Sequence, residues 1–197
     1  MKLKIMRIIT GKYKGRIIRM PKGIRPTQDK VRKALFDILQ DIEGLSFLEL
    51  FAGSGAVGIE ALSQGAKEVV FVEQDKRCAE AIKDNLSVIG LLSAKRICGS
   101  AMVCGGGYRV IGLDTIEAIK RLSQKKKKFD IIFSDPPYYM DLAKKTLQIL
   151  GAYDILAPNG FIIMQHFKKD EIPKEAGKLK LIKESRYGDT VLSFYKK

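Results

Sequence analysis

The tetrapeptide Asp135-Pro136-Pro137-Tyr138 follows directly after an apolar run at residues 129–133. This segment combines an acidic side chain, two rigid prolines and an aromatic ring at the end of a buried strand. Such a combination suits the recognition of a nucleobase by its amino group. The carboxylate can accept hydrogens from an exocyclic amino group while the ring stacks on the base that carries this group. Proline pairs also occur in ordinary loops. Together with the turn described next, however, the tetrapeptide predicts methylation of the amino group of a nucleobase.

A glycine-rich turn, Gly53-Ser54-Gly55, separates a predicted strand at residues 47–51 from a predicted helix at residues 57–64. Glycine suits this place because a Cβ would block positive backbone dihedrals and the close approach of a ligand. Glu73 ends the next predicted strand, 20 residues after Gly53, where its carboxylate can accept both hydroxyls of a ribose. The segment therefore predicts a nucleotide-like cofactor.

The same segment leaves the cofactor open. Gly53, Gly55 and Gly58 also satisfy the dinucleotide fingerprint G-x-G-x-x-G, so a nicotinamide- or flavin-dependent oxidoreductase is an alternative. Glu49 counts against it, because a carboxylate just before the turn suits a cationic or amine-bearing ligand better than a pyrophosphate. Nothing nearby supplies an obvious proton donor for hydride chemistry.

Composition narrows the class of protein. The chain of 197 residues suffices for one domain with a full hydrophobic core and a small appendage. Three cysteines without paired spacing and a single histidine argue against a zinc site or a disulfide framework, and we expect no metal. We see no membrane span and no signal peptide, so we expect a cytoplasmic protein.

The formal net charge of +14 is concentrated near the start of the chain, where residues 1–28 hold nine Lys or Arg and no acid before Asp29. A basic segment gains affinity for a polyanion by releasing condensed counterions. A merely soluble basic surface is the plainer alternative. We expect RNA contacts from six residues: Arg7, Lys12, Lys14, Arg16, Arg25 and Arg32.

Hydrophobic patterns predict two parts. Residues 1–24 form a small basic β-hairpin, an RNA-binding appendage. In residues 25–197, short apolar strands alternate with helical patterns, which is typical of a Rossmann-like α/β domain with a doubly wound, mostly parallel sheet. Its first helix is expected to begin at Thr27, whose side chain can cap it. Residues 179–195 predict an antiparallel hairpin that closes the sheet.

These motifs, in this order, resemble the RsmD family of S-adenosylmethionine-dependent methyltransferases, which have a class I methyltransferase fold. That family acts on the N2 amino group of a guanine in small-subunit (16S) ribosomal RNA. The resemblance spans nearly the whole chain and includes a closing hairpin at residues 187–195. Four blocks carry it: residues 6–11 with 14–16, 25–27 with 31–32, 51–55, and 135–138.

The resemblance implies a monomeric enzyme that binds S-adenosylmethionine and acts on 16S rRNA or on a small-subunit assembly particle. Asp135, Pro136 and Tyr138 would hold the target base as the catalytic residues. The residues expected at the cofactor are Thr27, Glu49, Ala52, Gly53, Ser54, Gly55, Glu73, Gln74, Asp114 and Asp135.

One stretch departs from the family pattern, which places an Asp or Asn turn next to the cofactor adenine. Ser100 has the usual distance from Gly90 but is not an acid or amide. Asp114 is an acid that leads into a good helical pattern, yet it lies 14 residues later than Ser100. We prefer Asp114, in which case the region around residues 105–107 is an inserted, mobile loop beside the cofactor.

Two further functions remain open at this point. An adenine-N6 methyltransferase would use the same acid, prolines and aromatic ring, because these recognise any exocyclic amine. The Asp at position 135, where Asn is the other choice, favours guanine by resemblance only. A noncatalytic RNA-binding protein would leave the intact glycine turn and the tetrapeptide 135–138 unexplained.

Overall fold

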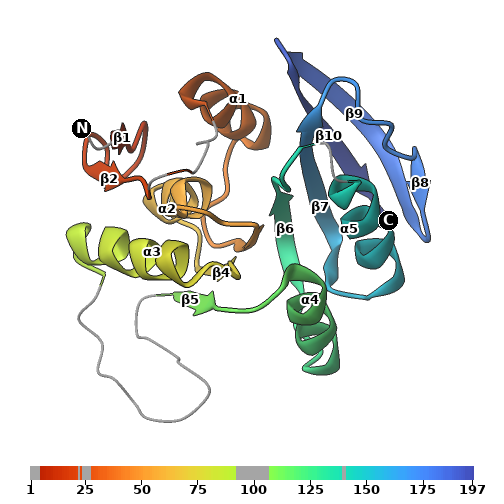
Figure 1. Ribbon diagram of the computed structural model, residues 1–197, viewed down its shortest axis with the longest axis horizontal. Helices are drawn as coiled ribbons and strands as arrows, with labels where there is room; N and C mark the ends of the chain where they lie inside the picture. The colour runs from red at the N-terminus through yellow and green to blue at the C-terminus, as the bar shows by residue number, and fades with distance from the viewer. Residues whose placement is uncertain (1–4, 22, 24–27, 92–106, 139–140) are drawn as a thin grey trace.

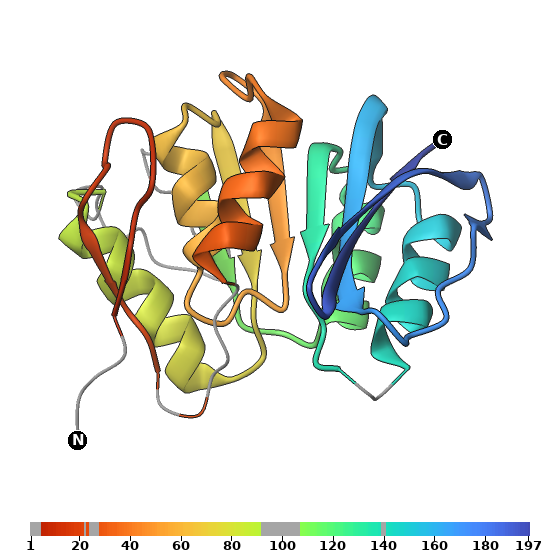
Figure 2. The ribbon, with the colours of Figure 1, turned by 90° about the horizontal axis from the view of Figure 1, so that it is seen from above.

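The molecule is built around one large β-sheet with helices on both faces, as Figures 1 and 2 show. The computed structural model describes residues 5–21, 23, 28–91, 107–138 and 141–197. A separate two-stranded sheet lies at one end and the last strands lie at the other. The strands are β1 (Ile5–Arg7), β2 (Ile17–Arg19), β3 (Ser46–Leu50), β4 (Glu68–Val72), β5 (Tyr108–Ile111), β6 (Phe129–Ser134), β7 (Leu156–Phe167), β8 (Glu175–Ala176), β9 (Leu179–Tyr187) and β10 (Thr190–Lys196).

The large sheet has the strand order β5-β4-β3-β6-β7-β10-β9-β8. Strands β5 to β7 in this order are parallel, whereas β10 pairs antiparallel with β7 and with β9. The predicted α/β class and the antiparallel closing hairpin are therefore confirmed. The chain builds outward from β3 to β5 and then returns to add β6 on the other side of β3. This reversal is the place where open α/β sheets bind ligands, outside the carboxyl ends of the strands.

The helices divide between the two faces of the sheet, so that each face has its own apolar core. One core lies under α1 to α3 and includes Phe47, Phe71 and Ile82, and the other lies under α4 and α5 and includes Ile119 and Leu147. None of the helices in the described ranges is long and apolar enough to cross a membrane. The helices are α1 (Asp29–Leu39), α2 (Ala56–Ser63), α3 (Lys76–Val88), α4 (Thr115–Gln124) and α5 (Leu142–Ala152).

The expected elements agree with this structure except in two places. The first helix begins at Asp29 with Gln28 at the N-cap position, and Gln28 makes no side-chain capping hydrogen bond. The predicted start at Thr27 is therefore wrong, while Thr27 itself lies outside the described residues. The two-residue strand β8 was not expected, because so short a segment has no periodicity of its own.

The basic hairpin is fastened to the domain. Strands β1 and β2 pair antiparallel, as predicted, and bury Met6 and Ile18 in the core beneath α1 to α3. The Glu60 carboxylate of α2 accepts hydrogen bonds from the backbone N–H groups of Ile9 and Thr10, at 2.9 Å and 2.7 Å. These contacts hold the exposed basic residues of the hairpin at a defined place beside α2 and α3.

Arg32 also attaches the hairpin to the domain. Its predicted contact with RNA is therefore wrong. Its side chain is 0% exposed, and Nη2 donates to the backbone oxygen of Arg7 at 2.5 Å. Its Nε lies 3.4 Å from Glu60 Oε2. Burial lowers the pKa of the Arg32 guanidinium, and the Glu60 carboxylate opposes that shift. Arg32 therefore joins α1, α2 and the hairpin within the protein.

We expect Arg32→Met to lower the free energy of unfolding by about 3–5 kcal/mol, because it leaves the buried Glu60 carboxylate without its cation. The matched control is Lys33→Met on the same helix. Lys33 is exposed and pairs with Asp37, so this change should cost at most about 1 kcal/mol. Urea unfolding of the three proteins measures the difference. Equal stability of the two variants would contradict the structural role given to Arg32.

Candidate active site

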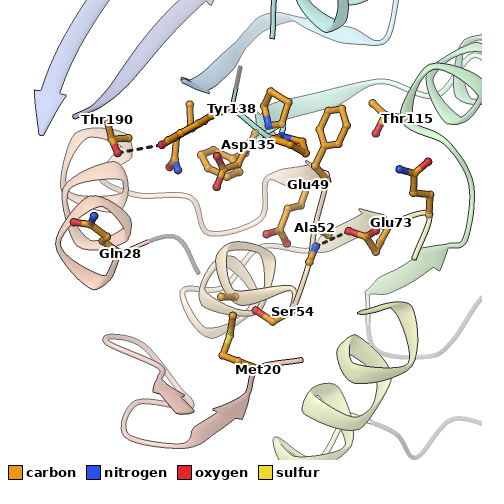
Figure 3. A pocket seen from close by; sticks show the side chains of 18 of the residues that line it. Met20, Gln28, Glu49, Ala52, Ser54, Glu73, Thr115, Asp135, Tyr138 and Thr190 are labelled. Atoms are coloured by element: carbon orange, nitrogen blue, oxygen red, sulfur yellow. Dashed lines mark hydrogen bonds between the residues drawn. The ribbon is translucent and has the colours of Figure 1, made fainter. Parts of the chain in front are cut away.

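A cavity of about 480 Å³ opens at the carboxyl ends of β3, β4 and β6, at the reversal of strand order (Figure 3). Parallel strands end at one edge of a sheet, so residues far apart in sequence meet there. The described residues that line the cavity are Met20, Gly23, Gln28, Glu49, Phe51, Ala52, Gly53, Ser54, Ala56, Glu73, Gln74, Thr115, Phe133, Asp135, Pro136, Pro137, Tyr138, Gln165 and Thr190.

The glycine turn after β3 forms the floor of the cavity. Gly53 and Gly55 have φ values of +54° and +74°, which a residue with a Cβ rarely adopts, as predicted for this turn. Phe51 also has a positive φ, +55°, although it is not glycine. Such a conformation in an aromatic residue is uncommon and occurs preferentially at functional sites. The backbone therefore turns sharply where a ligand would approach.

The Glu73 carboxylate holds this turn in place. Its Oε2 accepts from the Gly53 N–H at 2.8 Å, and its Oε1 accepts from the Asp75 N–H at 2.8 Å. An ionised carboxylate has about four acceptor positions, so two further donors can bind. Glu73 can thus fix the turn and still accept hydrogen bonds from hydroxyl groups of a ligand.

Glu49 is a buried carboxylate directly under the turn. Its side chain is 3% exposed, and Oε2 accepts from the Gly58 N–H of α2 at 2.8 Å. Burial raises the pKa of Glu49 to about 8, backbone N–H groups oppose the shift, and the neighbouring carboxylates of Asp135 and Glu73 add to it. In Figure 3 the three acidic side chains face the same cavity. Glu73 and Asp135 favour a cationic ligand, whereas burial favours the neutral form of Glu49.

Tyr138 forms the wall opposite the glycine turn. Its hydroxyl lies 3.2 Å from the Thr190 hydroxyl at the start of β10, and its ring centroid lies 5.8 Å from that of Phe167. The ring planes are tilted by 39°. The preceding Pro136 is buried. These contacts hold the tyrosine beside Asp135, so the cavity has an acidic group and a fixed aromatic ring at one end.

The cavity contains most of the predicted site. Nine predicted residues line it: Glu49, Ala52, Gly53, Ser54, Glu73, Gln74, Asp135, Pro136 and Tyr138. Gly55 lies just below, buried against Phe71 and Ile82. Thr27, Arg25 and Ser100 lie outside the described residues.

Asp114 is placed at the start of α4. It is exposed, and its Oδ1 accepts from the Ile116 and Glu117 N–H groups at 2.9 Å and 3.3 Å, so it caps the helix. Among the described residues that line the cavity, its neighbour Thr115 is present and Asp114 is not. The adenine contact expected of Asp114 stays a prediction.

Sequence reasoning missed several residues of the cavity. Met20 and Gln28 come from the hairpin and from the start of α1, and Gln165 and Thr190 come from β7 and β10. No local motif marks them, because they reach the cavity through the packing of distant elements. The one available signal was alternation along β7, which places Gln165 on the same face as the core residue Ile163.

Four predicted RNA-binding residues lie exposed on the hairpin: Arg7, Lys12, Lys14 and Arg16. Lys12 and Arg16 flank the Tyr13 ring, with their charged groups 5.5 Å and 5.6 Å from its centroid. Arg16 also donates to the Val88 backbone oxygen at the end of α3, at 3.0 Å. The hairpin thus presents a cationic surface with an aromatic ring in its middle.

Comparisons with known proteins identify the chain as a methyltransferase with the fold of S-adenosylmethionine-dependent enzymes. A solved structure named "Putative methyltransferase yhhF from Escherichia coli" has a TM-score of 0.81 and 29% identity, and the match covers 98% of each chain. "Putative rRNA methyltransferase YlbH" of Bacillus subtilis is 34% identical over 195 residues, 98% of this chain and 99% of that protein. "Ribosomal RNA small subunit methyltransferase D" of Haemophilus influenzae is 35% identical over 163 residues, 81% of this chain and 78% of that protein.

The model of a family described as "Conserved hypothetical protein 95" matches residues 6–196. The chain belongs to this family, which is the RsmD family that its motifs resemble. The oxidoreductase interpretation of the glycine turn is thereby set aside, as is the interpretation as a noncatalytic RNA-binding protein.

We expect Glu49→Gln to remove a pH dependence of stability. The pKa of Glu49 is about 8 in the folded protein, against an ordinary value of 4.5. Between these values the folded state holds more protons than the unfolded state, so the free energy of unfolding falls as the pH rises through this window. Urea unfolding without cofactor at about pH 5 and about pH 8 should show a smaller decline for Glu49→Gln than for the wild type.

The control is Glu43→Gln, which changes an exposed glutamate and should keep the decline of the wild type. An identical decline in Glu49→Gln and the wild type would mean that Glu49 is not protonated in this range.

Proposed function

We propose that this enzyme transfers a methyl group from S-adenosylmethionine to the N2 amino group of a guanine in 16S rRNA, either free or in a small-subunit particle. The observation that carries the proposal is the joint position of Asp135 and Tyr138 at a cavity with two further carboxylates. The relative from Haemophilus influenzae is named as a small-subunit rRNA methyltransferase. We also propose that the protein is a cytoplasmic monomer.

The residues of the cavity fit S-adenosylmethionine, which carries a sulfonium and an ammonium group as well as a ribose diol. Glu49 and the backbone of Gly53 and Gly55 would hold the methionine part, and Glu73 would accept the ribose hydroxyls. Ala52, Ser54 and Gln74 would complete the contacts, and Thr27 would lie near the methionine end. Asp114 or its neighbour Thr115 would lie at the adenine.

When bound, this cofactor supplies a methyl group that its sulfonium has already activated. The guanine amino group is a poor nucleophile, because its lone pair is delocalised into the ring. Hydrogen bonds from this group to the Asp135 carboxylate and the Pro136 carbonyl would favour its pyramidal form and direct the lone pair into the cavity. Orientation and electrostatics of this kind can supply roughly 7–11 kcal/mol. The proton released would pass to Asp135 or to solvent.

Tyr138 would stack on the target base, a contact worth about 1–3 kcal/mol by analogy with aromatic stacking on single strands. Its contacts with Thr190 and Phe167 hold the ring before any base arrives. The base must leave its own stack to enter the cavity, which costs a few kcal/mol in a duplex and less in a loop. An unpaired guanine in structured RNA is therefore the proposed target.

The hairpin of residues 1–24 would serve as the RNA-binding appendage of the methyltransferase domain at residues 25–197. Its exposed Arg7, Lys12, Lys14 and Arg16 would contact phosphates. Arg25, in the segment between the hairpin and α1, is a further proposed contact. Because the hairpin is fastened to α2, it would present the RNA at a constant distance from the cavity.

We expect Asp135→Ala to reduce methyl transfer by about 100-fold or more, as the loss of one preorganised group does in other active sites. The affinity for S-adenosylhomocysteine should stay within a few-fold. Single-turnover transfer to undermodified 16S rRNA and calorimetric titration measure the two quantities. The control Asp84→Ala changes an exposed acid on α3 and should behave as the wild type. Normal transfer by Asp135→Ala would remove Asp135 from the mechanism.

We expect Lys12→Gln with Lys14→Gln to weaken RNA binding and to flatten its salt dependence. At about 0.7 log units per phosphate contact on single strands, the slope of log K against log salt should fall by up to about 1.4. Filter binding at several salt concentrations measures the slope. The double change Lys144→Gln with Lys145→Gln, on exposed positions of α5, is the control and should leave it unchanged. An unaltered slope in the hairpin variant would mean that these lysines do not contact phosphate.

A further inference from the structure

Gln165 on β7 lines the cavity with a buried amide. The residue is 4% exposed, and its Oε1 has no hydrogen-bond partner among the residues that the structure describes. Two other buried side-chain atoms of the described residues share this property, Arg32 Nε and Ser134 Oγ. Of the three residues, Gln165 alone belongs to the described lining of the cavity.

An unpartnered buried acceptor is costly and therefore rare in folded proteins. The other acceptors of the cavity show the contrast, since Glu49 and Glu73 both accept hydrogen bonds from backbone N–H groups. Gln165 lines the cavity, so a small rotation of its side chain can bring the oxygen to a donor on a ligand. An unpartnered acceptor on a residue of the cavity wall points to recognition of such a donor.

The strand order places Gln165 on the side of the cavity that is proposed to hold the target base. The glycine turn and Glu73 follow β3 and β4, Asp135 follows β6, and Gln165 lies on β7, beyond β6. Ser134 pairs with Met164, so Asp135 and Gln165 each come one residue after this pair on adjacent strands. Adjacent strands lie about 4.8 Å apart. Gln165 is therefore next to Asp135, which is proposed to bind the amino group of the target base. It lies two strands away from β3, which leads into the glycine turn.

We propose that Gln165 selects guanine by accepting a hydrogen bond from the ring N1–H, an inference that rests on the proposed function. In guanine the N2 amino group is adjacent to N1–H, which is a donor. In adenine the N6 amino group is flanked by N1 and N7, which are both acceptors, and in cytosine N4 is adjacent to the acceptor N3. In the orientation that the structure gives the Gln165 amide, its oxygen beside Asp135 is thus satisfied by guanine and left unpaired by the other two bases.

The test compares Gln165→Met, which keeps the volume and removes the acceptor, with Gln165→Glu, which keeps an acceptor. The readouts are kcat/KM for methyl transfer to undermodified 16S rRNA, the Kd for S-adenosylhomocysteine and the thermal midpoint. We expect Gln165→Met to lower kcat/KM by about 10- to 100-fold, the range set by one unpaired buried group. The Kd should change less than about threefold, and Gln165→Glu should retain more activity than Gln165→Met. Gln148→Met, at an exposed position of α5, is the matched control.

The inference would be overturned by an unchanged kcat/KM in Gln165→Met, by an equal loss in both Gln165 variants, or by a weakened Kd that accounts for the loss. A lowered thermal midpoint with proportional loss of both activity and cofactor binding would also overturn it, because Gln165 would then be structural. The nucleoside product of the wild type separates this inference from the proposed function. A wild type that produces no N2-methylguanosine contradicts the function itself, whatever the variants do.

Discussion

The structure depends on the convergence of carboxylates at one end of a parallel sheet. Glu49, Glu73 and Asp135 come from three strands and would repel one another if all were ionised and unpaired. The protein meets this cost locally: the Gly58 and Gly53 N–H groups bind two of the carboxylates, and burial keeps Glu49 protonated near neutral pH. The glycine turn and the start of α2 are thereby fixed by two of the acidic side chains that face the cavity.

Because of the strand order, different strands supply different parts of the cavity. The strands β3 and β4 supply the glycine turn and Glu73, β6 leads into Asp135, and β7 and β10 supply Gln165 and Thr190. The residues proposed for the cofactor and those proposed for the target base thus lie on opposite sides of the reversal of strand order. The hairpin is held against the helices of one face by Arg32 of α1 and Glu60 of α2.

The fold and the position of the glycine turn at the cavity could be predicted because their signals are local. Apolar periodicity marks the strands and helices, and the glycine turn needs residues without a Cβ. Arg32 could not be assigned correctly, since a cation on a helix gives no sign that a carboxylate from another helix meets it in the core. Gln165 and Thr190 depend on the register of β7 against its neighbours, which no single segment encodes.

The proposed acceptor atom of the methyl group is guanine N2 in small-subunit rRNA. The most direct test incubates the enzyme with S-adenosylmethionine labelled in its methyl group and 16S rRNA or small-subunit particles that lack native modifications, followed by digestion to nucleosides. We expect the label to be recovered in N2-methylguanosine. Label in N6-methyladenosine would preserve the fold and the cofactor but contradict the proposed acceptor.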